Sequence, residues 1–78
     1  MKTYVLMFQE ITGQWVSVYH VSVVRRRSYV AALQDAKSCL IVGRCEGRYL
    51  GKRCVVYCTD DHAMWELVLV NGLVEVYC

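Results

Sequence analysis

The chain has 78 residues, the length of one small domain. Its residues are 56% hydrophobic and 21% charged, and proline is absent, a balance that excludes an intrinsically disordered protein. No apolar run reaches the roughly 18 residues that cross a bilayer, and the first residues lack a signal-peptide cleavage site. We therefore expect a single cytoplasmic domain over residues 1–78, without membrane contact.

The net charge of +2 is unevenly distributed along the chain. Residues 25–53 hold eight basic and two acidic residues, a balance of +6, whereas residues 54–78 hold four acidic residues and no basic one. Such asymmetry indicates charged partners rather than a particular fold. The five cysteines are odd in number, which favours reduced thiols over a disulfide framework.

The first two predicted elements are strands, at residues 3–9 and 14–24. Both are rich in β-branched and aromatic residues, and Gly13 supplies a turn residue between them. In the second strand, alternation predicts one face with Trp15, Tyr19, Val21 and Val23 and the opposite face with Val16, Val18 and Val24.

A helix is predicted to follow, over residues 28–40. Ser28 is placed as an N-cap, and Gly43 lies where a C-cap glycine is expected. The helical stripe is formed by residues at 4-3-4 spacing, namely Tyr29, Leu33, Ala36 and Leu40.

The rest of the chain is predicted to be β-structure: a strand at 52–59, a turn at 60–63 and a hairpin over 64–78. The hairpin turns at Asn71-Gly72, a dipeptide that accepts the positive φ of such turns. The order ββαβββ predicts an α+β domain, an antiparallel sheet of about five strands with one helix packed on one face.

One short helix covers only one face of such a sheet, yet apolar residues are expected on both. The second set comprises Val5, Met7, Val16, Val18, Val56, Val68, Val70, Val74 and Val76. Two explanations stay open: the sheet curls into a partial barrel, or the second face packs against another copy of the chain or another protein.

Cys54, Cys58 and His62 follow one another at intervals of four, with Cys45 upstream. In a strand the two cysteines stand ~13 Å apart, whereas zinc requires sulfurs about 4 Å apart. We therefore expect buried strand cysteines and no metal. The histidines lie in no catalytic motif, so we expect neither enzymatic activity nor a cofactor.

The stretch GRCEGRYLGKRC, residues 43–54, repeats a glycine followed by a basic residue. In extended backbone, Arg44, Arg48 and Lys52 share a face at ~13 Å intervals. Such a row suits a phosphate backbone, with Tyr49 as a base-stacking candidate. The alternative is a solvated strand edge whose basic residues prevent aggregation.

Three consecutive arginines, Arg25, Arg26 and Arg27, precede the helix. They oppose its dipole, and their guanidinium groups suit bidentate pairing with carboxylate or phosphate. The alternative is a basic corner that only confers solubility. In either case at least one of the three is expected to face solvent.

In size, single-domain build and mostly antiparallel sheet with one helix, the chain resembles the small phage-encoded inhibitors of bacterial defence, anti-CRISPR proteins among them. The resemblance implies an inhibitor that occludes a nuclease or a CRISPR–Cas complex and blocks its nucleic-acid binding. Asp60 and Asp61, together with Glu66 and Glu75, would then imitate phosphates. The partner-binding candidates are Arg25, Arg26, Arg27, Arg44, Arg48, Tyr49, Lys52, Arg53, Asp60 and Asp61.

The main alternative is a nucleic-acid-binding module that uses the central basic residues with Tyr49. It predicts affinity that falls steeply with salt. A structural subunit of a larger assembly is a third alternative, because it would also use the surplus of apolar residues.

Overall fold

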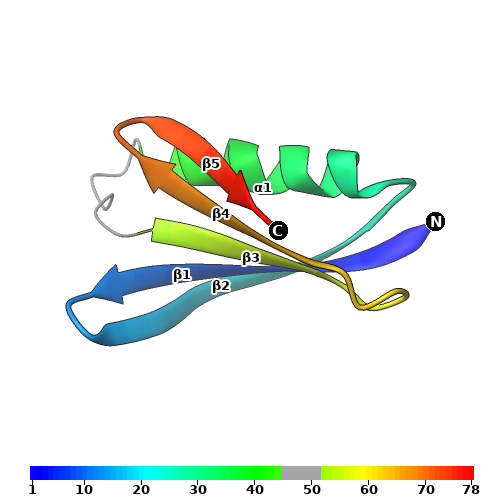
Figure 1. Cartoon of the computed structure of the whole chain (residues 1–78), viewed down its shortest axis with the longest axis horizontal. Coiled ribbons are helices and arrows are strands. Elements are labelled where there is room, and N and C mark those ends of the chain that lie inside the picture. Colours follow the sequence, from blue (N-terminus) through cyan, green and yellow to red (C-terminus); the bar gives the residue numbers. More distant parts are fainter. Residues whose placement is uncertain (45–51) are drawn as a thin grey trace.

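The computed structural model describes residues 1–44 and 52–78. Five antiparallel strands form one open sheet in the order β2-β1-β3-β4-β5, and a single helix, α1, lies along one face (Figure 1). The elements are β1 (Lys2–Thr12), β2 (Trp15–Arg26), α1 (Tyr29–Arg44), β3 (Lys52–Cys58), β4 (Met64–Val70) and β5 (Leu73–Tyr77). The α+β fold and its ββαβββ order are confirmed.

The first hairpin is longer and more tightly turned than the sequence predicts. β1 continues to Thr12 and pairs there with Trp15, so the connection has only two residues. Gly13 adopts a φ of 60°, which at the first position of a two-residue turn is typical of type II′. The predicted turn at 10–13 is wrong because Glu10 and Ile11 still pair across the hairpin.

A β-bulge in β2 changes which side chains share a face. Phe8 is paired with His20, but Gln9 is paired with Val18, so Tyr19 is an extra residue. Beyond the extra residue the alternation of β2 shifts by one position. Val16, Val18, Val21 and Val23 therefore lie on the same face of the sheet. The predicted separation of these valines onto two faces is wrong, because strict alternation does not allow for a bulge.

The helix presents small residues to the sheet. Ala32, Ala36 and Leu40, at intervals of four, are completely buried, and the two alanines let the helix lie close to the strands. α1 begins directly after Ser28, as predicted. It continues to Arg44, so the prediction that Gly43 lies beyond the helix end is wrong.

The core lies between α1 and one face of the sheet, here called the covered face. It comprises Tyr4, Leu6, Phe8, Ala32, Ala36, Leu40, Cys54, Val56, Cys58 and Leu67. At one edge of this core the ring of Tyr29 stacks on Trp65, with centroids 5.1 Å apart and planes 8° from parallel. Such ring pairs add to the stability that burial alone provides.

The C-terminal hairpin forms as the sequence predicts. Asn71 and Gly72 have φ angles of 51° and 82°, which is typical of a type I′ turn. β4 and β5 then pair from Val70–Leu73 to Glu66–Tyr77.

The partial barrel is not formed. β2 and β5 are the two outer strands of an open sheet and do not pair with each other. Val56, Val74 and Val76 lie on the covered face, in register with Leu6, Leu69 and Leu67 respectively. Their predicted place on the second face is therefore wrong, whereas Val5, Met7, Val16, Val18, Val68 and Val70 do lie there.

Candidate interaction surface

The face of the sheet opposite α1, here called the open face, carries a broad set of apolar side chains. Its apolar members are Val5, Met7, Ile11, Val16, Val18, Val21, Val23, Val55, Tyr57, Met64, Val68, Val70, Leu73 and Tyr77. Eight of them are exposed, by 38% at Val70 and by up to 73% at Leu73. Single exposed apolar residues are ordinary, but a contiguous apolar set on one face is typical of an interaction surface.

A polar network crosses this face from β1 to β4. The Arg53 guanidinium donates through Nε to Oε1 of Gln9 and approaches Oε1 of Glu66, with Nη1 3.6 Å away. Gln9 is largely buried, and its amide in turn contacts the Met7 sulfur at 3.4 Å. Arg53 therefore has partners on both neighbouring strands, and its guanidinium group links β1, β3 and β4.

Two carboxylates, Glu66 and Glu75, lie on the β4–β5 half of the open face. The Tyr77 hydroxyl donates to Glu75, and this hydrogen bond is the main reason that the pKa of Tyr77 is raised. The side chain of Glu66 is 44% exposed despite its contact with Arg53. This half of the face is therefore apolar with an acidic character.

The three arginines before the helix have separate roles. Arg26 donates through Nε to Oδ2 of Asp35 at 2.7 Å and through Nη1 to the carbonyl of Arg25, also at 2.7 Å. These bonds tie the end of β2 to α1. Arg25 and Arg27 are exposed, which confirms that at least one of the three faces solvent.

Lys52 does not belong to an exposed basic row. It is 2% exposed and lies on the covered face, because it is two residues before Cys54 on β3. Its ammonium group sits 4.6 Å from the centre of the Tyr19 ring, a cation–π contact. The expectation that Lys52 binds a partner from the surface is wrong for this reason.

The expected basic row also includes Arg44 and Arg48, with Tyr49 beside them. Arg44 is the last residue of α1, and its side chain is not described. Arg48 and Tyr49 lie outside the described residues.

Asp60 and Asp61 form hydrogen bonds within the turn between β3 and β4 and with the start of β1. Asp60 accepts from the backbone N–H of Thr3 at 2.7 Å, and Asp61 accepts from that of Ala63 at 3.0 Å. Asp61 also accepts from the Lys2 ammonium at 2.9 Å, and this bond is the main reason that its pKa is lowered. Both carboxylates stabilise the turn, so we leave them out of the candidate surface.

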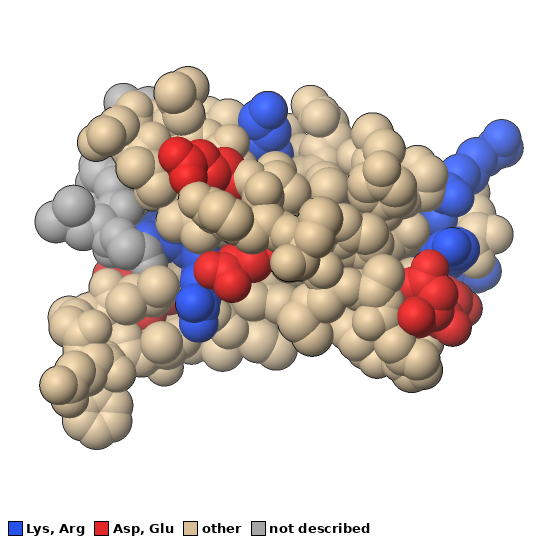
Figure 2. All heavy atoms as spheres, in the orientation of Figure 1, with Lys and Arg blue, Asp and Glu red and all other residues tan. Residues whose placement is uncertain are grey.

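Charged groups of both signs meet at the end of the molecule where the N-terminus, the start of α1 and the β3–β4 turn come together (Figure 1). Figure 2 shows this mixed cluster at the right-hand end, separated from the next charged side chains by a broad stretch of other residues. Opposite charges this close largely neutralise one another, so this end does not present a single-sign field.

The cysteines expected to be buried are buried. Cys54 and Cys58 lie in the core, and burial raises the pKa of the Cys54 thiol to about 12. Nδ1 of His62 contacts the Tyr57 hydroxyl. Among residues 1–44 and 52–78, no three histidine, cysteine or acidic side chains gather as a metal site.

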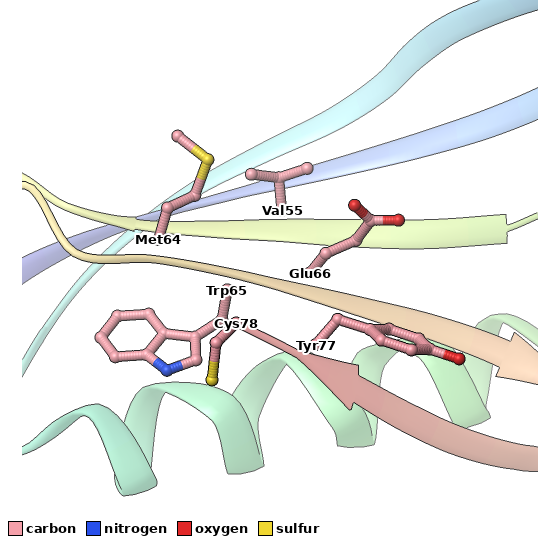
Figure 3. A pocket seen from close by; sticks show the side chains of 6 residues that line it. All are labelled: Val55, Met64, Trp65, Glu66, Tyr77 and Cys78. Carbon is pink, nitrogen blue, oxygen red and sulfur yellow. The ribbon is translucent and has the colours of Figure 1, made fainter.

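A shallow pocket of about 160 Å³ lies near the end of β5. Figure 3 shows Val55, Met64 and Glu66 on one side of the strands and Trp65 on the other, so the pocket wraps around the sheet rather than entering it. Small-molecule sites usually enclose about 300–1,000 Å³. The pocket is therefore a recess in the surface and does not indicate a substrate.

The chain matches no known protein family, curated protein or solved structure. None of the described helices is long and apolar enough to span a membrane.

Two features that shape this surface, the partner of Arg53 and the bulge in β2, have no local signal in the sequence. Gln9 lies directly opposite Arg53 on the neighbouring strand β3, a cross-strand pair that becomes apparent only from the sheet register. The bulge at Tyr19 left no glycine or proline as a marker, so its effect on the valines emerges only from the register.

Proposed function

We propose that this protein is a non-enzymatic inhibitor that binds a bacterial defence nuclease or CRISPR–Cas complex through its open face and blocks nucleic-acid binding. The target class comes from the general resemblance to phage-encoded inhibitors. The observation that carries the binding role is the open face itself, where valine, methionine, leucine and tyrosine side chains are left exposed on a sheet whose other face is well packed.

The size of the open face suits a protein partner. Neighbouring strands lie about 4.8 Å apart and each residue advances ~3.3 Å, so five strands with the lengths observed here present roughly 20 by 25 Å. This projected area of about 500 Å² is enough for the apolar centre of a standard interface, which buries ~800 Å² per partner including its rim.

The charges on this face favour a basic target surface. Glu66 and Glu75 project from the β4–β5 half among apolar neighbours. Carboxylates held on an apolar platform pair with arginine and lysine groups that otherwise bind phosphate. This supports the part of the mimicry hypothesis that concerns Glu66 and Glu75.

A nucleic-acid-binding module is less well supported. Lys52 is buried, and Arg26 and Arg53 are engaged by Asp35 and Gln9. A phosphate-binding surface needs several accessible cations on one face. We therefore prefer the inhibitor, and the DNA mobility-shift experiment below also detects direct nucleic-acid binding by the protein.

The test uses purified CRISPR–Cas effector complexes of several types and labelled target DNA. We expect the protein to abolish the mobility shift of the DNA by one effector type at a stoichiometric ratio. Met64→Lys places a charge on the open face, where Met64 is 56% exposed, and should weaken inhibition by at least about tenfold.

Val42→Lys is the matched control, because Val42 is 63% exposed but lies on α1. This variant should inhibit as strongly as the parent protein. Unchanged DNA binding by every effector would refute the proposal. A salt-sensitive shift of DNA by the protein alone would replace it with the nucleic-acid-binding module.

A further inference from the structure

The outer strand β2 is a long apolar sheet edge. It runs for 12 residues, and the stretch from Trp15 to Val24 contains neither a charged residue nor proline. Within the described part of the chain no strand lies beyond it. Soluble proteins usually protect such an edge with lysine, proline, a very short strand or a bulge, because a long apolar edge pairs readily with another chain. Between Trp15 and Val24, β2 has only the bulge at Tyr19.

The sequence of this edge reads almost the same in both directions. Residues 16–23 are Val-Ser-Val-Tyr-His-Val-Ser-Val, so the valines and serines mirror one another about the Tyr19–His20 bond. Two antiparallel copies of this segment, centred on that bond, place valine beside valine and serine beside serine.

The bulge makes this symmetry structurally consistent. In a regular strand Val16 and Val23 would point to opposite faces, because they are an odd number of positions apart. The extra residue Tyr19 brings them to the same face, in register with Ile11 and Val5 of β1. Residues that face each other across an antiparallel pair must share a face, and here they do so only because of the bulge.

The backbone groups of these valines also point toward the outer edge. In a two-residue hairpin the residues flanking the turn, Thr12 and Trp15, form a hydrogen-bonded pair, and the pattern alternates from there. Val16, paired with Ile11, therefore directs its N–H and C=O away from β1. The alternation along β1 gives Val18, Val21 and Val23 the same direction.

We propose that β2 pairs with β2 of a second copy about a twofold axis at the Tyr19–His20 bond, joining two five-stranded sheets into one of ten strands. Val16 then faces Val23 of the partner subunit, and Val18 faces Val21 of the partner subunit. The contact is isologous, so it closes after two chains and does not continue into a filament.

The same register gives a neighbour to Trp15, the most exposed aromatic residue in the described part of the chain. Trp15 is 78% exposed and lies on the covered face, in register with Thr12. In the dimer it stands opposite Val24 of the partner subunit, a residue that packs against the core in each chain. The indole therefore gains an apolar neighbour at each end of the paired segment.

This inference goes beyond the proposed inhibitor role and does not depend on it. Edge pairing involves β2 alone and leaves the β4–β5 half of the open face accessible in both copies. A monomeric protein could still inhibit, and a dimeric protein could still fail to inhibit.

The first test is sedimentation equilibrium of the full chain under reducing conditions, because Cys39 and Cys78 are exposed. We expect a mass of twice 9.0 kDa at high concentration. Val18→Lys should weaken association by at least tenfold, since it places a charge at the edge. Val70→Lys, on the same face but on β4, should not. A monomer at all concentrations, or an equal loss in both variants, would overturn the edge pairing.

The second test fixes the register by disulfide trapping. In a background in which Cys39, Cys45 and Cys78 are serine, Val16→Cys with Val23→Cys should give a covalent dimer on mild oxidation, because paired Cα atoms ~5.5 Å apart suit a disulfide. The remaining cysteines are buried. Val18→Cys with Val23→Cys is displaced by one pair and should not crosslink. Equal crosslinking of both would refute the proposed register.

Discussion

Threonine substitutions at two valines test the difference between the faces of the sheet. Valine and threonine have the same branched shape and both favour strands, so the exchange changes mainly the burial of a hydroxyl. Val56 is 0% exposed on the covered face, whereas Val23 is 64% exposed on the open face. An unpaired hydroxyl in a core costs about 1–3 kcal/mol, but a hydrated one changes stability by less than about 0.5 kcal/mol.

Val56→Thr should therefore lower the unfolding free energy by about 2 kcal/mol, and Val23→Thr should leave it nearly unchanged. For a domain of this size the first loss corresponds to about 8–16 °C in Tm. Urea denaturation measures both, at a concentration low enough to keep the chain monomeric and with reductant present. An equal loss in the two variants would refute the claim that the monomer leaves one face open.

Three further outcomes follow from individual contacts. The Lys2 ammonium lowers the pKa of Asp61 in the folded state. The Asp61 carboxylate therefore stabilises the fold at pH values above its unfolded pKa of about 3.9, and this stabilisation is lost in acid. Asp61→Asn should flatten the dependence of the unfolding free energy on pH below about pH 4. Iodoacetamide at pH 8 should label Cys78 quickly and Cys54 only after unfolding, because Cys54 is buried with a pKa raised to about 12; peptide mass spectrometry would show early labelling of Cys54 if its burial were wrong. Gly13→Ala should lower the unfolding free energy by about 1–2 kcal/mol because alanine is strained at a φ of 60°. Steric contact adds nothing, since no atom lies within 4 Å of the added methyl group. An unchanged urea midpoint would contradict the turn geometry.

The sequence predicts the elements well because each has a strong local signal. Alternating β-branched residues, the Asn71-Gly72 dipeptide and the helical stripe after Ser28 all act over short distances. Element ends were less predictable, since Glu10 and Ile11 remain in a strand only because β2 pairs with them. Such pairing is a tertiary effect that local propensity does not contain.

The candidate surface was predictable in outline but not in its members. The surplus of valines indicated a second apolar face, yet one bulge at Tyr19 changed which valines belong to it. Similarly, Lys52 reads as a surface cation, but its position in β3 places it against Tyr19. Charge alone does not show whether a lysine is accessible.

In the monomer, the apolar open face is accessible to a partner. The most direct measurement is the NMR relaxation of valine methyl groups in dilute protein with a soluble paramagnetic agent. We expect strong relaxation enhancement for the methyl groups of Val18, Val21 and Val23 and little for those of Val56. Equal protection of all four methyl pairs would contradict it, because the face would then be covered within the single chain.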